Sequence, residues 1–269
     1  MSNFRTISLL IFFSKILEKV IYTRIYAHVV LHMILANEQY GFRSSLSTDN
    51  VSYTLIHEVL SAMNNKHAVG GIFCDLSKAF GCVNHRILLA KLEHYGIRGT
   101  SGALIKSYLT ERYQTVALND KTITVNYSNW ELVKHGVPQR SILSPLFFLL
   151  YINDMPTVTA KNAKLLLYAD DTSLIITNPS PIVFANKLNI VFANVGEWFR
   201  NNLLFLNFNK TTYLHFRTKN SQKLDLNITL QNNQITNSTN TKFLGLTIED
   251  TLSWKCHISH ILSKLSSAR

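Results

Sequence analysis

Apolar residues recur every three to four positions in seven segments of the chain, and this spacing is typical of one face of an α-helix. The predicted helices cover about residues 14–32, 51–63, 88–95, 101–111, 146–152, 182–200 and 258–265. In the first helix, the apolar face is predicted to consist of Phe13, Leu17, Val20, Ile21 and Ile25. The segment Ser47–Asp49 can cap the second helix, and Gly96 has the usual position of a residue that stops the third.

Short runs rich in β-forming residues alternate with these helices and predict strands. They cover residues 69–74, 114–118, 122–125, 164–168, 172–177, 203–206, 211–216, 226–230 and 243–248. Two pairs of runs are joined by tight-turn residues, Asn119-Asp120-Lys121 and Ala169-Asp170-Asp171, which indicates two hairpins. Together these elements predict an α+β fold, with helices packed on an antiparallel sheet.

The composition narrows the possible partners and locations. The chain has 269 residues, 46% of them hydrophobic, which is enough for one large domain or two small ones. Its 27 Lys and Arg residues against 16 Asp and Glu give a formal charge of +11, which favours polyanionic partners, although any basic protein carries such an excess.

The cysteines and the apolar runs bear on the compartment. Cys74, Cys82 and Cys256 are an odd number without metal-ligand spacing, so we expect reduced thiols in an intracellular protein, nuclear or cytoplasmic and not secreted. The apolar runs Ile7–Phe13 and Leu143–Ile152 are too short to cross a bilayer, and we expect no membrane segment.

Three acidic residues stand at the ends of predicted strands. Asp75 closes one apolar strand, and Asp170 and Asp171 form the tip of the second hairpin. If these strands end at one edge of a sheet, the carboxylates would converge there and would need cations to offset their repulsion. Such a cluster suits two Mg²⁺ ions that act in phosphoryl transfer. From these residues alone, solvated turn or helix-cap aspartates are an equally good interpretation.

Short motifs follow one another in order along nearly the whole chain. They are Ile7–Leu10, Ser14–Lys19, Gln39–Arg43, Phe73–Phe80 with Cys82–His85, Gly136–Gln139 with Ser141–Leu143 and Pro145–Asp154, Tyr168–Asp171, Leu206–Thr211 and Phe243–Gly245. This ordered set resembles the start of the fingers, then motifs A, B, C and D and the primer grip, of non-LTR retrotransposon reverse transcriptases, closest to insect-type elements such as jockey. A bare Ala-Asp-Asp would be a weak signal, whereas the whole set is specific.

The resemblance implies a right-hand polymerase fold with palm and fingers. Residues 1–70 and parts of 86–135 would form the helical fingers, residues 71–248 the palm with motifs A to E, and residues 249–269 the start of a truncated thumb. No endonuclease domain is expected before Met1. The implied partners are an RNA template, a DNA primer and dNTPs, with no small-molecule cofactor beyond a metal.

The resemblance also implies roles in catalysis. Asp75, Asp170 and Asp171 would hold two Mg²⁺ ions, or Mn²⁺, with Asp75 and Asp170 as the indispensable pair. Lys210 would donate a proton to pyrophosphate, although an ordinary surface lysine is nearly as good an interpretation. The primer grip would consist of Phe243, Leu244 and Gly245.

Five residues are implied in binding the nucleotide or the template. Leu76 would offer its backbone carbonyl to a metal, and Phe80 would exclude a ribose 2′-hydroxyl as a steric gate, unless it is simply a core aromatic residue. Gln139 would support the templating base or the incoming nucleotide. Arg5 and Arg43 have guanidinium groups that fit phosphate, ordinary solvated arginines being the alternative.

Four positions depart from the family pattern. Gly81 stands where family members carry Asp, and Thr6 stands where they carry Pro. Arg140 and Ser144 stand where they carry Gly, and an arginine at position 140 adds strain if the backbone there needs a positive φ. We therefore predict low or absent activity.

Three functions compete on these residues. They are an RNA-directed DNA polymerase, a catalytically inactive remnant that binds nucleic acid, and a metal-dependent phosphohydrolase. The phosphohydrolase would need neither Phe80 nor Gln139 and is the weakest of the three. Mg²⁺-dependent dNTP incorporation that Asp170→Asn abolishes would separate the first two. His257 and His260 have metal-ligand spacing, but nothing near them in the sequence completes a site, so they are expected on a helix surface.

Overall fold

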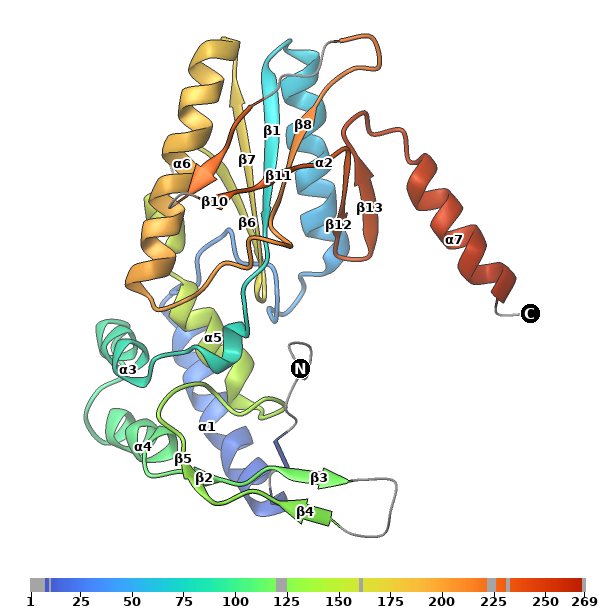
Figure 1. Ribbon diagram of the computed structural model, residues 1–269. Helices are drawn as coiled ribbons and strands as arrows, with labels where there is room; N and C mark the ends of the chain where they lie inside the picture. The colour runs from blue at the N-terminus through green and yellow to red at the C-terminus, as the bar shows by residue number, and fades with distance from the viewer. Residues whose placement is uncertain are drawn as a thin grey trace. The chain divides into compact units, whose positions relative to one another are not determined.

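The computed structural model describes residues 8–9, 11–119, 125–159, 162–221, 226–230 and 233–267. The chain forms two compact units that interleave along the sequence. One consists of Met1–Leu35 and Lys78–Ile152, and the other of Ala36–Ser77 and Asn153–Arg269. Helices and a largely antiparallel sheet confirm the predicted α+β class (Figure 1). The bounds given above for fingers, palm and thumb stay predictions.

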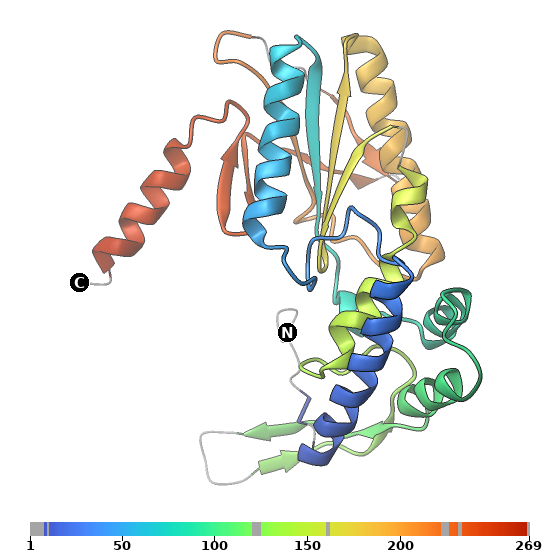
Figure 2. The ribbon, with the colours of Figure 1, turned by 180° about the vertical axis from the view of Figure 1, so that it is seen from behind.

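The first unit is built around helix α5. It contains α1 (Phe12–Leu31), η1 (Ala79–Gly81), α3 (His85–His94), α4 (Gly99–Leu109), α5 (Leu143–Ile152), and the strand pairs β2 (Tyr113–Gln114) with β5 (Glu131–Leu132) and β3 (Ala117–Asn119) with β4 (Val125–Tyr127). Helix α5 contacts both α1 and α3, and α1 runs alongside it (Figure 2). Every residue of α5 except Pro145 is buried, so this apolar run forms the core of the unit.

The second unit contains a five-stranded sheet in the order β11-β8-β1-β7-β6. Its strands are β1 (Ala68–Cys74), β6 (Lys164–Tyr168), β7 (Asp171–Asn178), β8 (Thr212–Phe216) and β11 (Thr236–Asn237). All neighbours are antiparallel except β11 and β8. The unit also contains α2 (Thr48–Asn64), η2 (Met155–Val158), α6 (Pro181–Asn201), β9 (Thr229–Leu230), β10 (Asn233–Gln234), β12 (Asn240–Phe243), β13 (Leu246–Glu249) and α7 (Lys255–Ser267).

Helices α2 and α6 cover opposite faces of this sheet. Side chains alternate along each strand, so each helix packs on a different set of them. The apolar stripe of α2 packs with Val69 and Phe73 of β1. On the other face, Phe184 of α6 lies beside Gly70 of β1 and His215 of β8. The two views from front and back show one helix on each side (Figures 1 and 2).

Three predicted strands are wrong. Residues 114–118 are divided between β2 and β3, which pair with β5 and β4. Residues 203–206 contribute only one isolated bridge, between Leu76 and Leu206. Residues 243–248 are not one strand, because Leu244 and Gly245 have φ of 46° and 91° and turn the chain between β12 and β13. Positive φ at both central residues is the signature of a type I′ hairpin turn. The turn predicted at 119–121 lies partly outside the described residues.

The predicted apolar face of α1 is confirmed at Ile21 and Ile25 and wrong at its other three positions. Phe13, Leu17 and Val20 are 77%, 53% and 54% exposed. The buried positions of this helix are Glu18, Ile21, Ile25 and Val29. The inward face includes a carboxylate because other parts of the same unit donate hydrogen bonds to Glu18. Within the described ranges, no helix combines the length and apolar character needed to cross a membrane.

Candidate active site

Asp75 follows the last residue of β1, where two segments hold its backbone. Its N–H donates to the hydroxyl of Thr211 at 3.3 Å, and its carbonyl accepts from the N–H of Asn207 at 2.8 Å. The N–H of Ser77 donates to the carbonyl of Phe205 at 2.8 Å, so the link across Leu76 is held on both sides. Thr211 is fully buried and was not predicted as a site residue. These contacts fix the position of the Asp75 backbone at the end of β1.

Asp171 lies at the same edge of the sheet. The antiparallel register of β1 and β7 pairs Cys74 with Thr172, so one further step brings Asp75 level with Asp171. Both residues line one pocket of about 580 Å³. The pocket is lined by Phe73, Cys74, Asp75, Asp171, Ser173, Lys210, Thr212, Asn240, Thr241, Lys242, Phe243, Leu244 and Gly245. Two acidic residues nearly a hundred positions apart in the sequence thus share one cavity.

Asp170 is in the turn between β6 and β7 and does not line this pocket. Tyr168 pairs with Asp171, so Ala169 and Asp170 form a two-residue turn. Ala169 has a φ of 55°, as the first central residue of a type II′ turn requires. This turn presents Asp170 and Asp171 on successive positions.

Gly41 supports this turn from the preceding loop. Backbone hydrogen bonds join Tyr40 N–H to the Leu167 carbonyl at 2.8 Å and Leu167 N–H to the Glu38 carbonyl at 2.9 Å. A Cβ at Gly41 would come within 2.4 Å of the Ala169 nitrogen, which no real contact tolerates. Gly41 is therefore required by the close approach of two backbones. The sequence contained this glycine within the Gln39–Arg43 motif, but its role becomes visible only in the fold.

The donor chemistry of the pocket fits a divalent cation in part. Among the residues that the structure describes, no three His, Cys, Asp or Glu side chains stand close enough to hold a metal ion. Mg²⁺, however, is commonly bound through one or two carboxylates plus substrate phosphates, and Asp75 and Asp171 supply that pair. Cys74 lines the same pocket, but burial raises the pKa of its thiol to about 12, so it stays protonated and is a poor ligand.

The predicted primer grip forms the turn of the β12–β13 hairpin and borders the pocket. Phe243 packs edge-on against Phe73 of β1, with ring centroids 5.9 Å apart. The hydroxyls of Thr212 and Thr241 are 2.9 Å apart and join the hairpin to β8. Lys210 is exposed and lines the same pocket. The structure therefore gathers Asp75, Asp171, Lys210 and residues 243–245 around one cavity.

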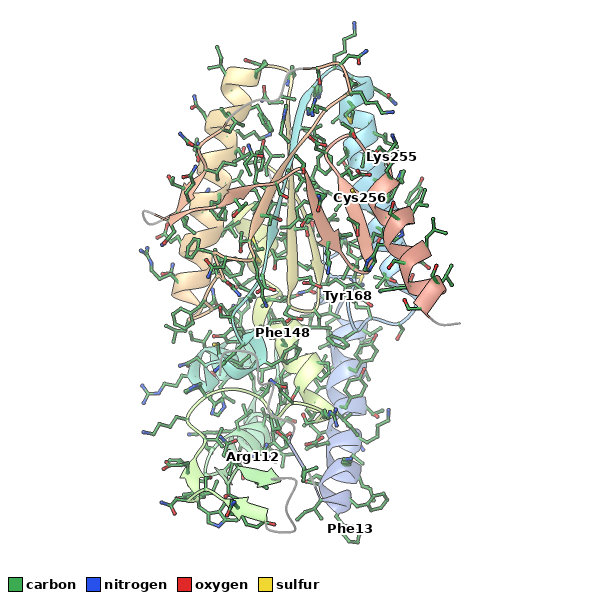
Figure 3. All side chains as sticks on the ribbon, turned by 45° about the vertical axis from the view of Figure 1, so that its right-hand side comes forward. Phe13, Arg112, Phe148, Tyr168, Lys255 and Cys256 are labelled. Carbon is green, nitrogen blue, oxygen red and sulfur yellow. The ribbon has the colours of Figure 1, made fainter. Side chains whose placement is uncertain are left out.

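Phe80 and Gln139 belong to the other unit, where a backbone hydrogen bond joins Phe80 to the loop that contains Gln139. The ring of Phe80 is half-buried and stacks on Phe148 of α5, labelled in Figure 3, with centroids 4.6 Å apart. The Phe80 carbonyl accepts from the N–H of Val137 at 2.9 Å, two residues before Gln139. Gly136 has a φ of 87° and lies directly against the backbone of Gly81.

The two departures that matter most differ in their local geometry. Arg140 is exposed and has a φ of 70°, the left-handed region that disfavours a residue with a Cβ. Gly81 is different, because a Cβ there would meet nothing closer than the Cβ of Lys78 at 3.8 Å. The backbone at position 140 thus calls for glycine, whereas position 81 has room for a side chain.

The remaining predicted nucleotide contacts are Arg43 and Arg5. Nη1 of Arg43 donates to the carbonyls of Ala36 and Gln39 at 2.9 and 3.1 Å, so at least part of this guanidinium closes its own loop. Arg5 lies outside the described residues. A phosphate contact by either arginine stays a prediction.

Comparison with known proteins places this site in a family. The model of the family described as reverse transcriptase (RNA-dependent DNA polymerase) matches residues 1–248. The chain is 28% identical over 268 residues to the probable RNA-directed DNA polymerase from transposon BS of Drosophila melanogaster. It is 27% identical over 267 residues to the RNA-directed DNA polymerase from mobile element jockey of the same species. These alignments cover 95% and 96% of this chain, and the chain spans 28% of the length of each relative.

Solved structures agree on the fold. Apo telomerase from Candida tropicalis, truncated from its C-terminal domain, superposes with a TM-score of 0.56 over 87% of this chain and 44% of that chain. At 15% identity this likeness concerns the fold alone. The motif order, the shared acidic edge and the family match over most of the chain lead to one conclusion. The chain belongs to the reverse transcriptase family, with homologues among the RNA-directed DNA polymerases of non-LTR mobile elements.

Proposed function

We propose that this chain is the RNA-directed DNA polymerase core of a non-LTR mobile element, working inside the cell. It would extend the 3′-hydroxyl of a DNA primer along an RNA template, with dNTPs as substrates. One observation carries this proposal: Asp75 and Asp171 meet at one sheet edge, in a pocket that Lys210 and the β12–β13 turn also line. The names of the homologous mobile-element polymerases supply the reaction.

Asp75, Asp170 and Asp171 would hold two Mg²⁺ ions, or Mn²⁺ in their place. When bound, such ions lower the pKa of the primer hydroxyl and neutralise charge on the triphosphate and the leaving pyrophosphate. The primer 3′-hydroxyl would lose its proton to water as its oxygen bonds to the α-phosphorus. The bond from the α-phosphorus to the leaving oxygen would break, and Lys210 would give a proton to the departing pyrophosphate. Leu76 would contribute its carbonyl oxygen, and the turn at Phe243–Gly245 would support the primer end.

The other unit would select the nucleotide. Phe80 would lie against the sugar and reject a ribose by contact with its 2′-hydroxyl. Stacking on Phe148 supports that role, because it limits how far the ring can move away. Gln139 would support the base pair, and Arg5 and Arg43 would contact phosphate groups of the nucleotide or template.

A second candidate is a catalytically inactive remnant that binds nucleic acid by charge. Arg140 favours it, because a long cation in the left-handed region of the motif B loop is both strained and bulky. We expect the unaltered chain to have little activity for this reason. Gly81→Asp with Arg140→Gly would restore the family residues at both positions.

Primer extension on an RNA template separates these candidates. The proteins to compare are the unaltered chain, the Gly81→Asp/Arg140→Gly chain, and the latter with Asp170→Asn. The proposal expects Mg²⁺-dependent dNTP incorporation by the restored chain and its loss in the Asp170→Asn protein. If the restored chain binds primed RNA but incorporates nothing with Mg²⁺ or Mn²⁺, the inactive remnant is the correct function. Vigorous synthesis by the unaltered chain would contradict the expected impairment.

A further inference from the structure

Glu18 is a buried carboxylate in the first unit. It lies on α1 and is 1% exposed. Oε1 accepts a hydrogen bond from the hydroxyl of Tyr108 at 2.6 Å, and Oε2 accepts one from the backbone N–H of Ile142 at 2.8 Å. Burying a carboxylate is costly unless its oxygens are satisfied, and here each oxygen has a donor.

The Ile142 N–H ends the loop that carries Gln139 and Arg140. This loop closes on itself at the carbonyl of Pro138, which accepts from the Ser141 N–H at 3.1 Å and from the Ser144 hydroxyl at 2.5 Å. At its start, the Val137 N–H donates to the carbonyl of Phe80 at 2.9 Å. Glu18 thus links α1 to the Ile142 end of this loop, and Phe80 is hydrogen-bonded to its other end at Val137.

Tyr108 and Arg112 complete the surroundings of this carboxylate. Burial, and then the hydrogen bond to Glu18, raise the pKa of the Tyr108 phenol to about 12, so at neutral pH the hydroxyl is protonated and donates. The guanidinium of Arg112, labelled in Figure 3, lies 5.1 Å from the centre of the Tyr108 ring.

We propose that Glu18 is the positioning residue of the motif B loop. Its carboxylate, through the bond to the Ile142 N–H, fixes that end of the loop, orients Gln139 and confines Arg140 to the left-handed region. That Gln139 then meets nucleotide or template rests on the function proposed above. The effect of Glu18 on the loop is independent of that function, and it can be measured without any polymerase activity.

Amide hydrogen exchange of the full chain tests the hold directly. Glu18→Ala removes both bonds, Tyr108→Phe removes only the hydroxyl, and Glu18→Gln keeps an oxygen for Ile142. The matched control is Glu58→Ala, a half-buried helical glutamate of the other unit that forms an ion pair with Lys164 at 3.9 Å. We expect protection at Ile142 to fall about tenfold or more in Glu18→Ala, the effect of one lost charge-assisted hydrogen bond. It should fall less in Glu18→Gln and little in Tyr108→Phe or Glu58→Ala.

The distribution of the change decides between positioning and simple destabilisation. Positioning predicts increased exchange at the amides of residues 139–144, with α1 and α4 amides unchanged. An equal loss of protection throughout the unit, or unchanged exchange at Ile142 in folded Glu18→Ala, overturns the proposal. If the Glu18→Ala protein does not fold, the Glu18→Gln protein provides the test. The proposal is overturned if the Ile142 amide of Glu18→Gln exchanges only through global unfolding of the protein.

Two further readouts respond only to loop position. The gain in Tm from Arg140→Gly should shrink in the Glu18→Ala protein, because a released loop no longer forces position 140 into positive φ. An equal gain in both backgrounds contradicts the proposal. In the Gly81→Asp/Arg140→Gly chain, Glu18→Ala should raise KM for dNTP more than it lowers kcat. If no variant polymerises, the function proposed above fails while the exchange result still stands.

Discussion

Among the residues other than glycine that have a positive φ beside a predicted site, Ala169 and Arg140 belong to different units. Ala169, with a φ of 55°, starts the turn between β6 and β7. Arg140, with a φ of 70°, is in the loop before α5. Ala169 is small and 8% exposed, whereas Arg140 is long and exposed. The same backbone requirement has therefore been met in opposite ways.

The difference follows from what holds the turn and the loop. The Ala169 turn is closed by strand pairing and touches the backbone of Gly41, so any side chain at position 41 would collide with it. The Arg140 loop is held by backbone bonds and also by the side chains of Glu18 and Ser144, and Arg140 itself is exposed. A turn that packs against another backbone leaves no room for a larger side chain there. A loop residue that faces solvent can be replaced by a larger one, although a positive φ then adds strain.

The largest effect is expected at the acidic edge. In the Gly81→Asp/Arg140→Gly chain, Asp75→Asn or Asp171→Asn should lower primer extension by about 100-fold or more, because each removes a carboxylate charge from the pocket. Asp49→Asn, at an exposed acid in the first turn of α2, is the control and should leave the rate unchanged. Equal rates for Asp171→Asn and its parent would remove the acidic pocket from the mechanism.

Gly41→Ala tests whether backbone contact holds the Ala169 turn. The new Cβ would come within 2.4 Å of a backbone nitrogen, so one of two packed segments must move. We expect a loss of about 1–3 kcal/mol in the free energy of unfolding, measured by chemical denaturation. Gly81→Ala is the matched control, since its nearest neighbour is 3.8 Å away, and stability should be unchanged or slightly higher. A fully stable Gly41→Ala protein would show that the turn is not held in this way.

Much of the second unit could be predicted from the sequence because its signals are local. The strand before Asp75, the hairpin that carries Asp170 and Asp171, and the cap at Ser47 each combine a pattern with a terminator only a few residues away. The split of 243–248 was missed because positive φ at Leu244 has no sequence signature.

Glu18 shows where such reasoning ends. Its spacing with Ile21 and Ile25 puts a carboxylate on an apolar stripe, but the local sequence does not show which groups donate hydrogen bonds to it. Its partners Tyr108 and Ile142 are 90 and 124 positions away, so their convergence is a property of the fold. The same holds for Gly41, whose need to be glycine depends on Ala169.

Arg140→Gly should give a smaller effect of opposite sign. Glycine adopts positive φ without a Cβ clash, so the free energy of unfolding should rise by about 1 kcal/mol. Arg140→Ala is the control, because it removes the cation but keeps the Cβ and should give little gain. Thermal denaturation of both variants measures the difference. If alanine stabilises as much as glycine, the arginine charge rather than its backbone is the source of the cost.

The smallest effect concerns the support beneath the Arg140 loop and appears only in alkali. The pKa of Tyr108 rises from an ordinary 10.0 to about 12 in the folded chain, mainly through burial. Between these values the folded state holds a proton that the unfolded state has released, so stability is fully present below pH 10 and declines as pH rises toward 12. Burial also raises the pKa of Tyr213, so the unaltered chain alone cannot assign the decline. The difference in the free energy of unfolding between this chain and Tyr108→Phe isolates the contribution of Tyr108. This difference should narrow when urea denaturation is repeated from about pH 9 to about pH 11. Parallel curves across that interval would mean that the Tyr108 hydroxyl is not held as a donor to Glu18, and the loop would then depend on the Ile142 bond alone.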